Sequence, residues 1–242
     1  MAIKQVAVGK VVAWEKLQDR RVPLELLLLL RVQAVPGVVR ILDFYERRDS
    51  FIFIMERPAN GMDMFDFISK KKKLEEDLAR KLFWQTLNIL VACAARGVYH
   101  KDIKDENLVV DLDKDKLVLV DFGSGGVELE DREEHRYEGT RLYAPPEWIQ
   151  HRRFRAESLT VWQLGILLYV MLVGDIPFHE DLDILAGLEA LRPRIEVSPD
   201  CGALLRGLLA PREGDRLRLT EVAGQPWLLA ISSHADSDYI TE

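Results

Sequence analysis

A polar loop at residues 100–108, His-Lys-Asp-Ile-Lys-Asp-Glu-Asn-Leu, constrains this chain more than any other stretch of the sequence. It follows an apolar helical run and precedes an apolar, strand-like run, so rigid elements on both flanks present its side chains. The loop contains a candidate proton acceptor, Asp102, a cation, Lys104, and a candidate metal-coordinating amide, Asn107. It is therefore the first candidate for a functional site.

A second apolar run, residues 117–120, leads into Asp121 on an Asp-Phe-Gly turn, whose glycine permits unusual backbone angles. Asp102 is suited to orient an attacking hydroxyl group. Asn107 and Asp121 supply oxygen ligands that can hold a divalent metal against nucleotide phosphates. This arrangement is typical of phosphoryl transfer, and two motifs in this order and spacing are a strong signal.

The two motifs resemble those of the protein kinases, in which His-Arg-Asp is followed by an Asn five residues after the Asp and then by Asp-Phe-Gly. Lys101 replaces the usual Arg. The resemblance implies an α+β, bilobal fold with a small antiparallel-sheet N-lobe and a larger helical C-lobe. It also implies that Asp102 and Lys104 are catalytic, with Asp102 accepting the hydroxyl proton, and that Asn107 and Asp121 bind Mg²⁺.

The opening residues, Met-Ala-Ile-Lys, are similar to the kinase Val-Ala-Ile-Lys motif, which implies that Lys4 holds the α- and β-phosphates of ATP. Its expected partner is Glu25, the only acid in a leucine-rich helix predicted over residues 23–32, with Pro23 in the first turn. An unpaired carboxylate among these leucines would be costly unless it faces Lys4 or water. The alternative is a surface glutamate.

In kinases a Gly-rich hairpin over the phosphates lies upstream of the lysine strand, and no Gly-x-Gly-x-x-Gly motif occurs in this sequence. We expect a short N-lobe and a nucleotide that binds more weakly, and with its phosphates more exposed to water, than in kinases with this hairpin. The predicted strands of the N-lobe are residues 2–12, 38–46 and 50–56. The predicted divisions are residues 1–57 for the N-lobe, 58–230 for the C-lobe and 231–242 for a disordered tail.

The segment Glu56-Arg57-Pro58 stands where the kinase lobes are joined, and Glu56 would receive the adenine through its main chain. Pro58 has no amide hydrogen, so one customary donor to the purine is absent. This proline, together with residues 21–25, 40–51 and 174–178, resembles the Pim serine/threonine kinases, and the likeness extends from about residue 1 to residue 230.

Three acids, Asp63, Asp105 and Glu106, stand where Pim kinases read basic residues ahead of the target serine or threonine. Paired carboxylates bind a guanidinium in bidentate fashion, so we expect a basic, arginine-rich protein or peptide substrate. Each acid alone is more often only a surface charge. The net charge of −7 also favours basic partners and gives no reason to expect nucleic acid.

The loop after Asp-Phe-Gly has no serine or threonine between Gly126 and Gly139 and is acidic instead. We therefore expect no requirement for phosphorylation in this loop, although Tyr137 remains a candidate for modification. The Pro-Pro-Glu segment resembles the family's Ala-Pro-Glu motif, which implies that Glu147 pairs with a buried Arg216.

A second reading belongs to another functional class. Without a phosphate-covering hairpin, the chain could be a pseudokinase, a kinase-shaped module that binds basic segments and turns over slowly or not at all. The complete set of candidate catalytic residues argues against this reading, while Lys101 argues for it. A kinase of small molecules is disfavoured by the Pro-Pro-Glu segment, which shapes a peptide platform in protein kinases.

The composition is that of an ordinary globular protein, with 242 residues of which 48% are hydrophobic. Cys93 and Cys201 are too few for a disulfide framework, and we interpret them as structural thiols in a reducing compartment. The apolar runs are shorter than the roughly 20 residues that span a bilayer, and no signal peptide is visible. We expect a monomer in the cytoplasm, with the nucleus as the alternative, and no membrane partner. The basic run at residues 70–73 is expected to be a solvated loop between helices.

Overall fold

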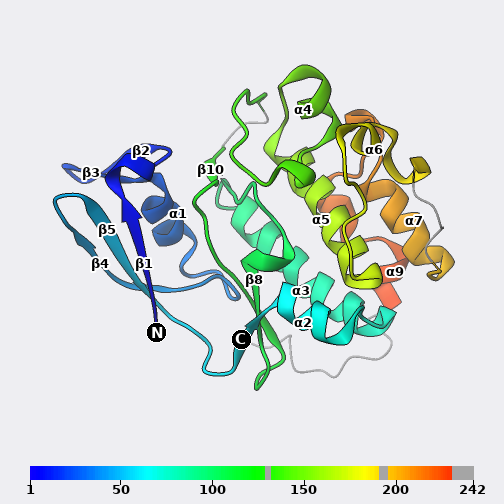
Figure 1. Cartoon of the computed structure of the whole chain (residues 1–242), viewed down its shortest axis with the longest axis horizontal. Helices are drawn as coiled ribbons and strands as arrows, with labels where there is room; N and C mark the ends of the chain where they lie inside the picture. Colours follow the sequence, from blue (N-terminus) through cyan, green and yellow to red (C-terminus); the bar gives the residue numbers. More distant parts are fainter. Residues whose placement is uncertain (129–131, 191–195, 231–242) are drawn as a thin grey trace.

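The computed structural model has a small, sheet-containing N-lobe beside a larger helical C-lobe (Figure 1). It describes residues 1–128, 132–190 and 196–230, so the predicted tail lies outside the described residues. The arrangement confirms the expected α+β, bilobal class. The lobe boundaries at residues 57 and 230 stay predictions.

The N-lobe is built on an antiparallel sheet of three strands in the order β1-β5-β4. These are β1 (Ala2–Ala7), β4 (Ile41–Glu46) and β5 (Ser50–Met55). The central strand β5 buries Phe51 and Phe53, as alternation in a half-buried strand requires. The three predicted strands are confirmed, but two are clearly shorter than expected. β1 ends at Ala7, where the 3₁₀ turn Val8–Lys10 follows, and β4 begins at Ile41 and not at residue 38.

A hairpin of β2 (Trp14–Leu17) and β3 (Arg20–Pro23) was not predicted. Its charged, mostly exposed residues do not alternate clearly, so the sequence pattern does not show the strands. It is attached to the sheet through Trp14, which packs edge-on against Phe51 with ring centroids 5.8 Å apart.

Helix α1 (Leu24–Val32) directly follows the hairpin and buries Leu26, Leu28 and Leu29. Pro23 is the N-cap residue of this helix, so the prediction that it lies in the first turn is wrong by one position. Because leucines cover several sides of α1, the helix packs between the sheet and the C-lobe (Figure 1) and is not an ordinary surface helix.

The C-lobe is organised around α5 (Ala156–Val173), which is buried over most of its length. By length and composition this helix could cross a membrane, but 83% of its apolar window is buried inside the domain, which explains its mean hydropathy of 1.6. It packs against α3 (Glu76–Ala94), which buries Leu82, Phe83 and Leu87.

Smaller elements complete the C-lobe. They are α2 (Met64–Lys71), β6 (Gly61–Asp63), β7 (Val98–Tyr99), β8 (Leu108–Asp111), β9 (Lys116–Leu119), β10 (Gly126–Val127), α4 (Pro146–His151), α6 (Asp181–Ala186), α7 (Pro199–Leu208), α8 (Leu219–Val222) and α9 (Pro226–Leu229). Lys70 and Lys71 form the last turn of α2, which corrects the expectation that the whole basic run is a loop. Cations favour that position because they complement the helix dipole.

The predicted pair of Glu147 and Arg216 is confirmed. The guanidinium Nη1 and Nη2 atoms each lie 2.9 Å from a carboxylate oxygen of Glu147, and the Arg216 side chain is fully buried. Nη1 also donates to Ser158, and Nε donates to the Ala210 carbonyl. This bidentate pair joins α4 to the chain segment before α8.

We expect Glu147→Gln to lower the free energy of unfolding by about 3–5 kcal/mol, because it leaves the Arg216 charge buried without its counter-charge. Urea denaturation followed by fluorescence measures this loss. The matched control is Lys81→Gln, which breaks an exposed pair with Asp115 (2.7 Å) and should cost less than about 1 kcal/mol. Equal losses for the two variants would contradict the assignment.

Candidate active site

Pairing of two short strands brings the two candidate metal ligands to the same place. β8 and β9 are antiparallel, with Leu108 opposite Leu119, and the Val120 amide donates to the Asn107 carbonyl at 3.0 Å. Asn107 precedes β8 and Asp121 follows β9 by two positions, so both residues lie at the same end of this strand pair.

Asp121 lies in a strained backbone conformation with φ of +62°, which is uncommon for a residue that has a side chain. Its Oδ1 atom accepts from the Gly123 amide at 3.1 Å and from Lys4 Nζ at 2.7 Å. Burial alone would raise the pKa of Asp121, but the hydrogen bond and charge of Lys4 outweigh it, so this pKa lies below its ordinary value. The carboxylate is therefore ionised near neutral pH.

Lys4 joins three parts of the molecule. From β1 its ammonium reaches Glu25 of α1 at 2.6 Å and Asp121 at the edge of the C-lobe at 2.7 Å. Burial would lower the pKa of Lys4, but the two carboxylates raise it above its ordinary value. The predicted contact between Lys4 and Glu25 is confirmed, and the alternative of an unpartnered surface glutamate is wrong because Glu25 is buried.

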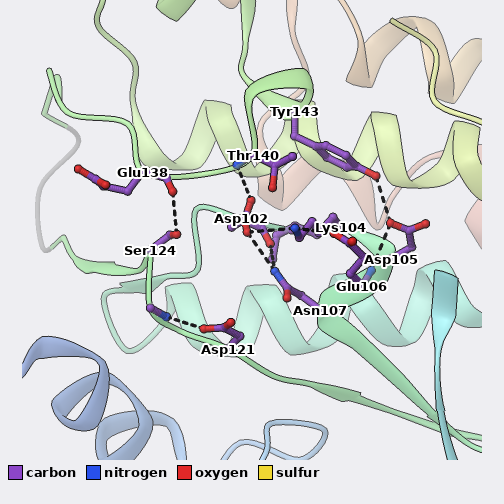
Figure 2. Close-up of polar contacts among 12 residues, drawn as sticks. Asp102, Lys104, Asp105, Glu106, Asn107, Asp121, Ser124, Glu138, Thr140 and Tyr143 are labelled. Carbon is purple, nitrogen blue, oxygen red and sulfur yellow. Dashed lines mark hydrogen bonds and ion pairs between the residues drawn. The ribbon is translucent and has the colours of Figure 1, made fainter. Parts of the chain in front are cut away.

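The Asp102 carboxylate is held from two sides (Figure 2). The Thr140 amide donates to Oδ1 at 2.7 Å, and Asn107 Nδ2 lies 3.2 Å from Oδ2. Lys104 Nζ is 3.8 Å from the same Oδ2 atom and also pairs with Glu106 at 2.5 Å. A carboxylate oriented in this way, beside a cation, is arranged as a general base would be.

His100 connects the loop to the strand end at Val120 through hydrogen bonds of both ring nitrogens. The Asp102 amide donates to its Nδ1 at 3.3 Å, so the ring proton is on Nε2, which donates to the Val120 carbonyl at 2.9 Å. Burial lowers the pKa of His100, and the neutral ring packs edge-on against Phe122 with centroids 4.7 Å apart. One side chain thereby links the Asp102 loop to the Asp121 turn.

Lys101, at the position of the usual kinase arginine, is buried and has φ of +62°. Its ammonium forms ion pairs with Glu128 (3.0 Å) and with Glu134. Burial lowers the pKa of Lys101, and the Glu134 carboxylate opposes this shift. The two carboxylates belong to the segment between Asp121 and Glu147, so a cation in the loop is neutralised by the chain's own acids.

The donor atoms of Asn107 and Asp121 fit a magnesium ion. Asn107 Nδ2 donates to the Asp102 carbonyl at 2.8 Å, which leaves the amide oxygen Oδ1 directed elsewhere. One amide oxygen and one carboxylate are hard ligands of the kind Mg²⁺ prefers when phosphates and water complete its coordination. Across the described ranges 1–128, 132–190 and 196–230, no three His, Cys, Asp or Glu side chains cluster well enough to hold a metal by themselves.

Glu56 lies outside this group of residues. Its amide donates to the Arg40 carbonyl at 2.9 Å, and its carboxylate pairs with the same arginine at 3.1 Å. It borders a cavity of about 630 Å³ together with Arg40 and Pro58, and this cavity does not include Lys4 or Asp121. The cavity is therefore not assigned to the phosphates, and a role for the Glu56 main chain at adenine stays a prediction.

The three predicted substrate acids differ in their surroundings. Asp105 is only 7% exposed and accepts from the Tyr143 hydroxyl at 3.3 Å and from the Glu106 amide at 3.2 Å. Burial raises the pKa of Asp105. Its carboxylate is enclosed and already bonded to Tyr143, and its predicted contact with substrate stays a prediction. Figure 2 shows the contact with Tyr143.

The other two acids remain accessible. Glu106 has a side chain that is 58% exposed and pairs with Lys104. Asp63 is the N-cap residue of α2 and accepts from the Asp66 amide at 2.8 Å through Oδ1. Their contact with substrate stays a prediction.

Two residues that contact the loop at residues 100–108 were not predicted from the sequence. Thr140 contacts Asp102 through a backbone amide, which leaves no trace in residue type. Gln163 donates to the Lys101 carbonyl and accepts from the Ile103 amide. The sequence could have indicated a role for Gln163, because a glutamine among the apolar residues of a buried helix needs hydrogen-bond partners. Tyr137, a predicted candidate for modification, instead directs its hydroxyl inward to the Thr140 carbonyl at 2.8 Å.

A model of the protein kinase domain matches residues 1–228, nearly the whole described chain. The chain belongs to the protein kinase family. This kinase is 38% identical over 242 residues to the serine/threonine-protein kinase pim-2 of Danio rerio, across 96% of this chain and 77% of that protein. The resemblance to Pim kinases is thereby confirmed.

Two further relatives are serine/threonine-protein kinases. Prk-2 of Caenorhabditis elegans is 36% identical over 230 residues, which cover 94% of this chain and about half (52%) of that protein. The PAS domain-containing serine/threonine-protein kinase of Mus musculus is 32% identical over 208 residues, which cover 86% of this chain and 15% of that protein. The similarity to these relatives supports the assignment of this chain as a protein serine/threonine kinase.

We expect Lys101→Met to lower the free energy of unfolding of this kinase by about 3–5 kcal/mol, since Glu128 and Glu134 lose their buried counter-charge. A triple variant, Lys101→Met with Glu128→Gln and Glu134→Gln, should recover most of the loss because no buried charge is then uncompensated. Urea denaturation compares the two. A triple variant no more stable than the single one would contradict the importance of this cluster.

Proposed function

We propose that this kinase transfers the γ-phosphoryl group of ATP, with Mg²⁺, to serine or threonine hydroxyls in basic, arginine-rich protein segments. The observation that supports it most is the convergence of Lys4, Asp102, Asn107 and Asp121 from both lobes on one region. Each contributes the atom type that phosphoryl transfer requires.

In the proposed reaction Asp102 is the general base. Its carboxylate, fixed by Thr140 and Asn107, accepts the proton of the substrate hydroxyl as that oxygen bonds to the γ-phosphorus and ADP leaves. Because two hydrogen bonds hold the carboxylate, little reorientation is needed at the moment of reaction. This positioning accounts for much of the catalysis expected in phosphoryl transfer.

Two lysines supply positive charge at the site. Lys4 is proposed to bind phosphate oxygens of ATP, and its contact with Glu25 fixes where its ammonium lies. Lys104, 3.8 Å from Asp102 Oδ2, is proposed to neutralise charge on the transferred group. Asn107 and Asp121 would hold Mg²⁺, which supplies further charge neutralisation at the phosphates.

The proposed preference for basic segments has its support in Glu106 and Asp63. The Glu106 carboxylate is largely exposed on the loop that holds Asp102, and Asp63 begins α2 nearby, since α2 contacts this loop. Exposed carboxylates beside a phosphoacceptor site attract arginine side chains and raise the rate of encounter with a cationic peptide.

A kinase-shaped binding module without turnover is the second candidate. It is favoured by the exposure of the phosphate-binding groups, since 31% of the Lys4 side chain and 51% of the Asp121 side chain are open to solvent. Contacts between charges are weaker in water than in an enclosed site, so ATP would bind weakly.

We expect Asp102→Asn to lower kcat by about 10²–10⁴-fold and to leave binding of ATP with Mg²⁺ unchanged, because the base acts only in the chemical step. Asp121→Asn should weaken Mg²⁺-dependent ATP binding as well. Titration calorimetry measures ATP binding, and phosphorylation of an arginine-rich serine peptide measures turnover. A wild-type rate no higher than that of Asp102→Asn would favour the binding module.

We expect Glu106→Gln to raise KM for an arginine-rich peptide by about tenfold, the loss of one charge-assisted hydrogen bond. The same variant should change KM little for a matched peptide whose arginines are replaced by alanine. Glu15→Gln, which removes an equal charge from an exposed position in the N-lobe hairpin, is the control. If Glu106→Gln and Glu15→Gln have the same effect on both peptides, Glu106 does not contact the substrate.

A further inference from the structure

Gln163 is a fully buried amide at the centre of α5, the apolar helix that organises the C-lobe. A buried side-chain amide without hydrogen-bond partners destabilises the fold, and contacts with leucines do not compensate for this. The hydrogen bonds of Gln163 therefore explain why an amide is tolerated at this buried position. Its neighbours along the helix, Trp162 and Leu164, are apolar and equally buried.

The amide of Gln163 bridges the two residues on either side of Asp102. Its Oε1 accepts from the Ile103 amide at 3.0 Å, and its Nε2 donates to the Lys101 carbonyl at 3.1 Å. Both hydrogen bonds are made to main-chain atoms. They therefore fix the peptide units on either side of Asp102 independently of the side chains of Lys101 and Ile103. Lys101 has φ of +62°, a conformation that persists only where surrounding contacts hold it.

The second hydrogen of Nε2 connects Gln163 to another segment. It points to the Tyr137 hydroxyl at 3.4 Å, and that hydroxyl donates to the Thr140 carbonyl at 2.8 Å. The Thr140 amide in turn donates to Asp102 Oδ1 at 2.7 Å. The donors and acceptors match in number, because an amide nitrogen has two hydrogens and a hydroxyl can donate once and still accept.

These contacts close a ring that starts and ends at Asp102. It runs through Gln163 on one side and through Tyr137 and Thr140 on the other. Gly139 lies inside this ring: a Cβ atom there would be 2.6 Å from the Lys101 carbonyl oxygen and 2.6 Å from the Tyr137 hydroxyl. The two segments therefore approach too closely for any side chain at this position.

We propose that Gln163 is a positioning residue for Asp102, and that with Tyr137 it couples the orientation of the base to the segment around Thr140. This inference rests on the proposed phosphoryl transfer. Gln163 does not contact substrate, and it acts through the Lys101 and Ile103 main chain. Tyr137 extends the same control to Thr140, so its hydroxyl is part of the ring and is not a free surface group.

The test compares Gln163→Met, which removes the hydrogen bonds at similar volume, with Leu164→Met, an apolar exchange at the adjacent buried position. For Gln163→Met we expect kcat to fall about 10–100-fold with KM for ATP unchanged, as a misplaced base predicts. Leu164→Met should keep kcat within about twofold. A Gln163→Met kcat equal to that of Leu164→Met would overturn the proposal.

Tyr137→Phe tests the coupling. Alone it should lower kcat by a smaller factor, and the double variant with Gln163→Met should lose less than the product of the two factors, since both act through one ring. Losses that multiply fully would overturn the shared ring and leave two independent effects.

Hydrogen exchange tests the positioning role of Gln163 without requiring enzymatic activity, so its outcome is independent of the proposed function. Hydrogen exchange of the Ile103 amide should accelerate in Gln163→Met but not in Leu164→Met, whether or not the wild-type chain phosphorylates a peptide. Unchanged exchange in Gln163→Met would overturn the positioning role. Absence of wild-type turnover together with accelerated exchange would overturn only the enzymatic proposal.

Discussion

The ammonium of Lys4 is the contact on which the arrangement of this kinase depends. It lies within 2.7 Å of carboxylates from α1 and from the Asp121 turn, so it fixes the distance between the N-lobe sheet and the C-lobe. Without Lys4, two neighbouring negative groups, Asp121 and the buried Glu25, would lack the cation between them. Removing the cation would separate the parts that the proposed reaction needs together.

The C-lobe part of the site is held by main-chain pairing and by two strained residues. β8 and β9 bring Asn107 and Asp121 to one end, and Lys101 and Asp121 adopt positive φ values that neighbouring bonds maintain. Strain of this kind persists where the surroundings determine it completely. His100 and Gln163 provide those surroundings, and both are buried polar groups with their bonding atoms satisfied.

Sequence alone could predict the parts of the site whose residue types the chemistry dictates. Asp102 and Asp121 are required as acids. The pairing of Glu25 with Lys4 followed from the kinase resemblance, and an acid among leucines has to face either a cation or water. The burial of Asp105 against the Tyr143 hydroxyl could not be predicted, because acids are usually exposed and only the fold brings the two residues together. The charged hairpin between β1 and α1 was missed because its strands lack alternation.

The cluster of Lys101, Glu128 and Glu134 has a consequence for how this kinase would be controlled. Both counter-charges are tied to the lysine through the same polypeptide, so their effective concentration at the ammonium is set by chain geometry and does not vary with time or place in the cell. A phosphate in that role arrives and leaves through other enzymes. An internal carboxylate cannot be withdrawn, so the charge balance at the Lys101 ammonium is set when the chain folds.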